Sequence, residues 1–363
     1  QNWQDESVTI RDFSAGAANA SGIFPFAASA EDVTAYHLGV DAQATPRLRI
    51  QLGVRQEDTN LEADAWGGNT EPGTDNAVEQ EYEDTLPAVS LTYELMENLQ
   101  LRGAYSETVN RPSLLEITGT TVRNPEDGNL YRGNVFLAPA DLTNYDLRLE
   151  WYFGDAEELS LGAFYKEFTD PIEVGKVQAQ NDIFTWFNAE EAELTGVEFD
   201  VRKNLPVGDW VGGEDTWNWF ALGFNISWLD SEVTLLGEGE TADDIPLTGG
   251  RKLAPVYANE RRMTGQSDLL YNIVLSYDNF AGMRGSLAYN FTSDRIALVG
   301  SDSAPDIVEE DRGQLDFTVK YELEMFQQQV EWVFKARNLL DQEVEYTQGG
   351  MLYERYSPGL DWT

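Results

Sequence analysis

The sequence contains no cysteine and only one histidine, His37, among its 363 residues. The absence of cysteine excludes a disulfide framework, a thiolate metal site and a thiol nucleophile. A zinc site of the HExxH type needs two histidines, and a Ser-His-Asp triad would have to use His37, which lies between Tyr36 and Leu38 in a strand-like run. Glycine-rich phosphate-binding motifs are absent as well. We therefore predict no catalytic residues, no metal ligands and no cofactor, and conclude that the protein is not an enzyme.

Basic residues are scarce. Lysine and arginine together number 24, against 64 aspartates and glutamates, which gives a net charge of -40. Nucleic acid is excluded as a partner because its phosphates would be repelled. Cationic ligands, divalent ions or a salty or anionic-lipid setting are compatible with this charge.

Long apolar runs are also absent. No stretch approaches the roughly 18 residues that a spanning helix needs, and the first residues, Gln1 to Gln4, show no secretory signal pattern. A membrane β-barrel would escape such a search because each of its strands gives only a weak, alternating signal.

Alternation of apolar and polar residues is what the sequence has in abundance. In the run from Asp146 to Phe153, Leu and aromatic residues occupy every second position. This period of two is typical of strands with differently solvated faces, and helical periodicity is nowhere sustained. We predict about thirteen strands, over residues 32–43, 47–62, 82–95, 98–109, 142–153, 158–169, 184–204, 216–231, 264–278, 284–298, 312–324, 329–346 and 353–363.

The connections between these strands alternate in length. The short ones lie at residues 44–46, 96–97, 154–157, 206–215, 280–283 and 325–327. The long ones lie at residues 63–81, 110–141, 170–183, 232–263 and 299–311. Short periplasmic turns and long extracellular loops are typical of an up-and-down outer-membrane barrel. We therefore predict an all-β, antiparallel transmembrane barrel, although alternation alone does not say which face of each strand points inward.

Several short stretches, in this order and at these spacings, resemble TonB-dependent outer-membrane receptors. They are Gly53 to Thr59, Leu86 to Tyr93, Ala104 to Ile117, Asn144 to Leu147, Phe187 to Ala189 with Gly196 to Glu198, and Ala336 to Asp341. The resemblance extends from about Glu31 to the end of the chain.

The resemblance implies a 22-stranded barrel with an N-terminal plug, of which this chain would hold about the last thirteen strands, without the plug and its TonB-contacting segment. We expect residues 1–31 to form an extracellular loop or an incomplete preceding strand, and residues 32–363 to form the barrel segment, with a truncated final strand. The resemblance also implies the outer membrane of a Gram-negative bacterium, contact with its lipid and lipopolysaccharide, and energy from the TonB-ExbB-ExbD complex. The implied activity is uptake of a scarce small molecule, such as a ferric siderophore, cobalamin or an oligosaccharide.

The long loops are where we expect substrate contact, because structured loops on a rigid scaffold usually carry recognition. Their few cations and tyrosines suit an anionic or aromatic ligand, and the candidates are Arg123, Tyr131, Arg132, Arg251, Tyr257 and Arg261. The alternative for each arginine is a salt bridge to a nearby loop carboxylate.

Two further features belong to the strand ends and loops. Pro112 cannot donate a ladder hydrogen bond, so Arg111 and Pro112 are expected to mark the extracellular rim, with Arg111 as a structural clamp. The acidic clusters at residues 190–193 and 306–311 are candidates for Ca²⁺ bound by carboxylates. We favour a solvated acidic surface for both, since neither has the spacing of a calcium loop.

Three functional hypotheses follow. The first is the energy-coupled uptake receptor. The second is a barrel without transport activity that serves as a structural or surface-binding subunit of a larger assembly. The third is a secreted, acidic, β-rich carbohydrate-active protein.

Overall fold

The computed structural model describes residues 6–11, 26–66, 77–124, 128–179, 183–211, 219–279, 281–302, 304–325 and 328–363. Most of the predicted segment 1–31 lies outside these residues, as do the middle of the 63–81 loop and parts of the turns at 206–215, 280–283 and 325–327.

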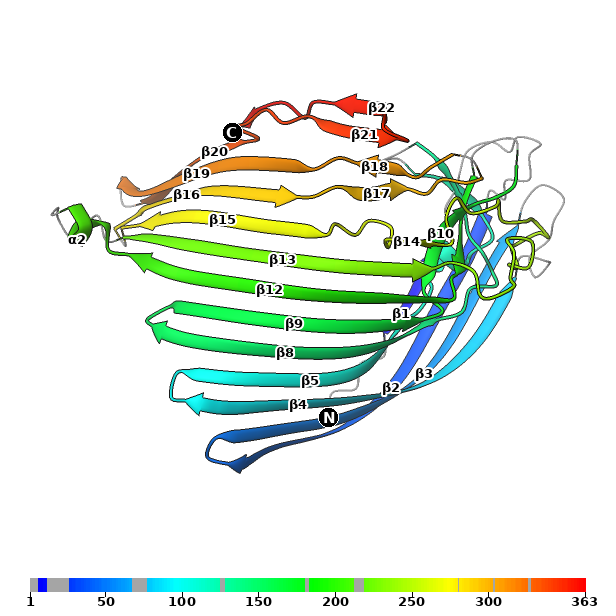
Figure 1. Ribbon diagram of the computed structural model, residues 1–363, viewed down its shortest axis with the longest axis horizontal. Coiled ribbons are helices and arrows are strands. Elements are labelled where there is room, and N and C mark those ends of the chain that lie inside the picture. Colours follow the sequence, from blue (N-terminus) through cyan, green and yellow to red (C-terminus); the bar gives the residue numbers. More distant parts are fainter. Residues whose placement is uncertain are drawn as a thin grey trace.

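One large antiparallel sheet dominates the described residues, and its strands follow one another in chain order (Figure 1). It consists of β1 (Glu6–Arg11), β2 (Phe26–Thr45), β3 (Leu48–Trp66), β4 (Val78–Met96), β5 (Leu99–Asn110), β8 (Ala140–Gly154), β9 (Glu157–Thr169), β12 (Glu191–Leu205), β13 (Phe220–Thr234), β15 (Leu269–Asp278), β16 (Met283–Thr292), β19 (Arg312–Met325), β20 (Gln328–Arg337) and β23 (Asp361–Trp362), with β14 (Glu260–Arg261) paired to β13. Neighbouring strands of this sheet pair antiparallel throughout. The predicted up-and-down barrel wall is confirmed.

The connections sort by length at the two ends of the wall, as predicted. Tight turns join β2 to β3, β4 to β5 and β8 to β9 at one end, where helix α2 (Val207–Val211) also lies (Figure 1). Ala156 adopts a positive φ of 58° in the β8–β9 turn, a conformation that permits the close reversal between the two strands. The long connections gather at the opposite end.

The long connections carry structure of their own. Helix α1 (Leu114–Ile117) begins at a capping box in which Ser113 and Glu116 bond to each other's backbone N–H groups. A first small sheet has the order β10 (Ile172–Lys176), β11 (Ile183–Asn188), β7 (Leu130–Arg132) and β6 (Thr121–Arg123). A second small sheet has the order β17 (Arg295–Leu298), β18 (Ile307–Glu309), β21 (Val344–Gln348) and β22 (Met351–Tyr356). We call the first of these the loop sheet.

The predicted strand 184–204 is wrong as a single element. Residues 183–188 form β11 of the loop sheet, and the wall strand β12 begins only at Glu191. The chain leaves the wall at residues 189–190, where Ala189 N donates to Pro171 O and Glu190 O accepts from Asp170 N. The residues of β11 are as rich in aromatic and β-branched side chains as those of a wall strand, which is why the two strands read as one.

Three other predicted strands are broken for similar reasons. The run 284–298 divides into β16 and β17 at Ser293 and Asp294, which bond to Leu269 and Arg262. The run 329–346 divides into β20 and β21 at a turn centred on Asn338, whose φ is 54°. The run 353–363 divides into the end of β22 and the short β23.

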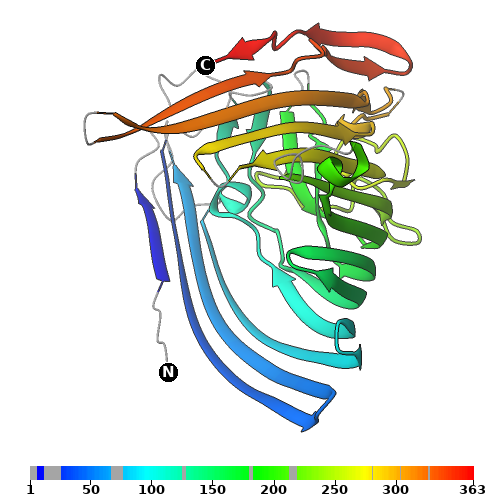
Figure 2. The ribbon, with the colours of Figure 1, turned by 90° about the vertical axis from the view of Figure 1, so that its left-hand side faces the viewer.

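Burial shows which face of the wall points inward. Ala192 and Val233 face each other across β12 and β13, and both are buried against residues of the folded loops. On β3, Leu61 and Ala63 are buried against α1 in the same way. The face that carries these residues is therefore the concave one, and Figure 2 shows the loops filling part of that concavity.

Candidate functional site

Asn134 holds the loops together at the extracellular end. Its side chain is almost fully buried, and Nδ2 donates to Trp186 O at 3.0 Å and to Pro246 O at 3.1 Å. Next to it, Val135 N donates to Thr248 Oγ1 at 2.9 Å. One short segment thus connects loops that are 52 and 112 residues away in sequence.

Two more asparagines act in the same way. Asn188 Nδ2 donates to Ala138 O and Asp170 O, at 2.9 and 2.8 Å, while its Oδ1 accepts from Ala138 N. Asn259 exchanges a pair of hydrogen bonds with the backbone of Leu236. Side-chain amides that satisfy several backbone groups in this way fix loop geometry. Any residue that the loop sheet displays is therefore held in a defined place.

One face of the loop sheet carries three aromatic rings and a lysine beside them. We call this group the aromatic platform, and it consists of Tyr131, Phe184, Trp186 and Lys176. The Tyr131 ring stacks on Phe184 with centroids 5.2 Å apart and lies 5.4 Å from Trp186. Lys176 Nζ lies 5.3 Å from the centre of the Phe184 ring. Phe184 is buried, whereas the other three side chains are partly exposed. The platform presents flat apolar surface beside a cation, which suits a ring-bearing ligand with negative charge.

Only Tyr131 of the platform was among the sequence candidates. Phe184 and Trp186 were assigned to a wall strand, and Lys176 to an undistinguished loop. The sequence does show a high aromatic content at residues 184–187, Phe-Thr-Trp-Phe. Such a segment looks the same in a wall strand and in a loop strand, so the sequence alone does not reveal a binding surface there.

Arg132 and Arg251 approach each other beneath the loop sheet. Arg132 follows Tyr131 in β7, so its side chain lies on the opposite face of the sheet, and it is only 5% exposed. Burial, and secondly the charge of Arg251, lower the pKa of Arg132 to about 10. The structure thus brings two of the predicted cations together, on the face away from the platform.

Tyr257 and Arg261 line a cavity on the other side of β10. Arg261 forms an almost fully buried ion pair with Glu173 at 3.0 Å, and Thr264 also bonds to that carboxylate. The cavity volume of about 20 Å³ leaves room for about one water molecule. Tyr257 is 51% exposed. This cavity is too small for a ligand.

Arg123 lies on the strand paired with β7, opposite Leu130 and on the sheet face away from the platform. It ends β6 and its Nη1 donates to the carbonyl of Gly128 within its own loop.

Arg111 lies directly after β5, at the end of the wall that carries the long connections, and bonds two carboxylates. Its Nη2 lies 2.8 Å from Glu57 Oε2 and also pairs with Asp84. Burial acts to lower the pKa of Arg111, but the bonds to Asp84 and Glu57 prevail and raise it. Pro112 is buried beside it and begins the turn into α1. Arg111 therefore joins β3 and β4 to the end of β5.

The acidic clusters make no metal site within the described chain, where no group of three or more His, Cys, Asp or Glu side chains is arranged to hold an ion. In the second cluster, Asp306 accepts from Gly300 N and Glu309 pairs with Arg295. Those carboxylates stabilise the second small sheet.

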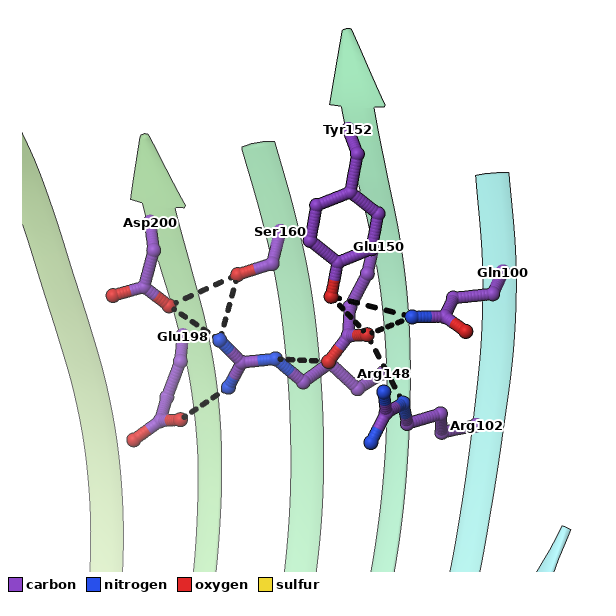
Figure 3. A network of polar contacts seen from close by, with 8 residues as sticks. All are labelled: Gln100, Arg102, Arg148, Glu150, Tyr152, Ser160, Glu198 and Asp200. Atoms are coloured by element: carbon purple, nitrogen blue, oxygen red, sulfur yellow. Dashed lines mark hydrogen bonds and ion pairs between the residues drawn. The ribbon is translucent and has the colours of Figure 1, made fainter. Parts of the chain in front are cut away.

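A polar network covers the inward face of the wall across β5, β8, β9 and β12 (Figure 3). Arg148 lies at its centre, 3.1 Å from Asp200, 3.4 Å from Glu150 and 2.8 Å from Ser160 Oγ. Arg102 and Gln100 extend it by bonding the other side of Glu150, at 3.0 and 2.7 Å. Charged residues can line this face because the concave side of a wide barrel is wet.

No helix among the described residues combines the length and apolarity that crossing a membrane requires.

Comparison with known proteins agrees with this architecture. The family model described as "TonB dependent receptor-like, beta-barrel" matches residues 1–339. No curated protein matches the chain.

Solved structures share the fold at low sequence identity. The siderophore receptor PiuA from Acinetobacter baumannii has a TM-score of 0.63 and 14% identity, and the match covers 93% of this chain and 43% of that one. The ferric-catecholate import receptor Fiu from K12 E. coli has a TM-score of 0.60 and 13% identity, and the match covers 90% of this chain and 44% of that one. The copper transporter OprC has a TM-score of 0.62 and 15% identity, and the match covers 93% of this chain and 48% of that one. The chain thus spans less than half the length of each of these structures.

The family match extends over nearly the whole chain, and the wall it describes is the one observed. TonB-dependent receptors are transporters rather than enzymes, and their barrels lie in the outer membrane of Gram-negative bacteria. The chain belongs to the TonB-dependent receptor β-barrel family and is an outer-membrane protein.

Proposed function

We propose that the receptor containing this chain imports a scarce small molecule across the outer membrane, with energy from the TonB-ExbB-ExbD complex. Binding would take place at the extracellular loops, and no covalent bond of the substrate would be made or broken. Family membership supports import as the activity. The substrate must be argued from the loops of this chain, because the solved structures are all distant in sequence.

The aromatic platform is the observation that carries the proposal. It lies on loops that Asn134 and Asn188 fix to one another, so a ligand would meet a preformed surface. Trp186 and Tyr131 would stack on a planar group, while Lys176 would face its negative charge. We assign Arg132 and Arg251 a supporting positive potential beneath the platform, and Tyr257, Arg261 and Arg123 remain peripheral candidates.

A ferric siderophore with aromatic iron-binding groups meets these requirements best, because each of its rings is planar and the complex is anionic. Fiu is a ferric-catecholate import receptor and PiuA is a siderophore receptor, although that likeness concerns the fold. Cobalamin and oligosaccharides are the alternative substrates.

Uptake by a deletion strain tests the proposal. The strain would be complemented with the full-length gene and supplied with a labelled ferric catecholate, ferric citrate, cobalamin or an oligosaccharide. We expect uptake of the ferric catecholate to depend on the gene, and Trp186→Ala to weaken its binding about tenfold through the loss of ring stacking.

Phe136→Ala provides the matched control, since Phe136 is an aromatic residue of the same loops that is 54% exposed and outside the platform. It should leave binding unchanged. If no probe depends on the gene, import of these substrates is wrong. If import is normal but Trp186→Ala binds as well as wild type, the platform is not the site.

A further inference from the structure

The outward face of the wall has a groove beside three tyrosines, along a row of apolar residues that includes the small Gly103 and Ala163. Tyr105, Tyr145 and Tyr165 face one another in register on β5, β8 and β9, with ring centroids 5.3 and 6.2 Å apart. One step towards the short turns, the same strands carry Gly103, Leu147 and Ala163 in register. Leu91 and Val197 continue that row on the neighbouring strands β4 and β12.

This arrangement leaves an open apolar groove of about 520 Å³. Gly103 and Ala163 provide its floor because they place almost no side chain there, and Leu91, Leu147 and Val197 stand 43%, 54% and 40% exposed around it. In an outer-membrane protein this face contacts lipid, so an acyl chain is the natural filling for a groove of this kind.

Carboxylates lie directly beyond the tyrosines, towards the extracellular end. Glu167, Glu193 and Glu232 face one another in register on β9, β12 and β13, and Glu107 occupies the same row on β5. The hydroxyls of Tyr105 and Tyr165 bond to Glu107 and Glu167, the second at 3.3 Å. Like charges directly opposite one another destabilise a sheet unless something compensates them.

Among the described residues, no lysine or arginine stands beside Glu107, Glu167 or Glu193 on the outward face of the strands that carry them. Within the described residues of β5, β8, β9, β12 and β13, the only outward lysine or arginine is Lys203, at the far end near the short turns, where it pairs with Glu157 at 2.8 Å. A lipid seated in the groove would therefore place its headgroup among unneutralised carboxylates. A phosphate headgroup would be repelled there, and a positively charged headgroup would be attracted.

We propose that this groove binds one lipid whose headgroup carries an amine and a net positive charge, with an acyl chain over Gly103 and Ala163 and the headgroup at the Glu107, Glu167 and Glu193 row. This lipid site is distinct from the substrate platform, and it does not depend on which molecule the receptor imports. The lipid stabilises the wall by neutralising the row of facing carboxylates.

A second groove offers an internal control. It has about 480 Å³ and is lined by apolar residues around Gly285, on β13, β15, β16 and β19 near the short turns. Its lining contains no carboxylate. A Cβ added at Gly103 or Gly285 would meet its nearest neighbours at 3.9 and 3.7 Å, which is ordinary van der Waals contact, so neither position is closed to a side chain by the backbone. Gly103→Leu and Gly285→Leu thus fill equivalent grooves with and without acidic neighbours.

Native mass spectrometry of the full-length receptor in mild detergent tests the proposal. The probes are lysyl-phosphatidylglycerol and phosphatidylglycerol with identical acyl chains, each measured with and without EDTA. We expect one retained lysyl-phosphatidylglycerol, favoured at least about fivefold over phosphatidylglycerol. Gly103→Leu should abolish this preference, and Gly285→Leu should leave it intact.

A double variant, Glu107→Gln with Glu193→Gln, separates the headgroup from the chain. It should keep lipid retention while removing the preference for the amine. Equal retention of both lipids by the wild type, or retention of phosphatidylglycerol that EDTA abolishes, would overturn the proposal, the latter in favour of a divalent cation bridging a phosphate. A heat-dependent gel shift confirms that each variant has assembled.

Discussion

At the scale of single residues, asparagines and arginines determine how the loops are fixed to the wall. Asn188 and Asn338 both fall within short stretches on which the family resemblance rested, and the structure gives each a physical role as a bidentate partner of backbone groups. Arg111 likewise lies within the stretch from Ala104 to Ile117. The sequence predicted a structural clamp at Arg111 without its partners, whereas the roles of Asn188 and Asn338 could not be derived because their partners are distant in the chain.

Arg111→Ala should destabilise the barrel more than it weakens substrate binding. The side chain is 14% exposed and its carboxylate partners 10% and 15%. Its loss leaves Asp84 half-buried without this counter-charge and leaves Glu57 paired with Arg55 alone, which we expect to cost about 3 kcal/mol of unfolding free energy. Urea unfolding followed by tryptophan fluorescence measures the change.

Arg123→Ala is the control for that measurement, since Arg123 ends a loop strand and bonds only locally to Gly128. It should change stability by less than about 0.5 kcal/mol. An Arg111→Ala protein that assembles and unfolds normally but no longer binds substrate would show that Arg111 belongs to the site instead.

At the scale of elements, alternation predicted where the wall strands lie but not where they stop. The wall strands and both classes of connection were predicted because the period of two and the turn residues are local properties. The predicted strands 184–204 and 329–346 each join two elements, because β11 and β21 have the aromatic and β-branched composition of a wall strand. They leave the wall through contacts made by Pro171 and Gly359, which are far away in sequence.

The turn at Asn338 allows a test of what ends β20 and separates it from β21. Asn338 has a φ of 54°, its Oδ1 accepts from Gln342 N at 2.9 Å, and its Nδ2 donates to Gln342 O and Gly359 O at 3.2 Å. Asn338→Ala removes these bonds and leaves in the left-handed region a residue that tolerates it less well than asparagine, so we expect a loss of about 3 kcal/mol. Asn338→Gly removes the same bonds without that backbone cost and should lose about 1 kcal/mol less.

Hydrogen exchange reports on this turn directly. Amides of β21 and β23 should exchange faster in Asn338→Ala than in Asn338→Gly, while those of β8 and β9 stay protected in both. Equal stability of the two variants would mean that the positive φ contributes nothing to the break between β20 and β21.

At the scale of the whole molecule, the chain forms an antiparallel wall and a loop insert that packs into its concave side. The sequence left open which face of the wall is inside, because period two is symmetrical. Burial of Ala192 and Val233 against the insert resolves it. The excess of carboxylates also differs between the two faces of the wall. Inward carboxylates pair with arginines such as Arg148, whereas the outward carboxylates of Glu167 and Glu193 have no arginine beside them within the described strands.

The apolar core of the insert touches the wall at Ala192 and Val233 but consists mainly of loop residues, so the insert should come apart before the wall does. Phe187 is 1% exposed and packs in a cluster with Leu235, Leu247 and Leu253. Phe187→Ala should cost the insert about 3–5 kcal/mol, whereas the wall keeps its ladder hydrogen bonds. We expect the variant to retain its heat-dependent gel shift and to be cut rapidly by external protease in residues 170–190 or 235–268. Phe136→Ala, at an exposed position, should resist the protease as wild type does. If Phe187→Ala abolishes the gel shift together with protease resistance, the insert and the wall fold as one cooperative unit.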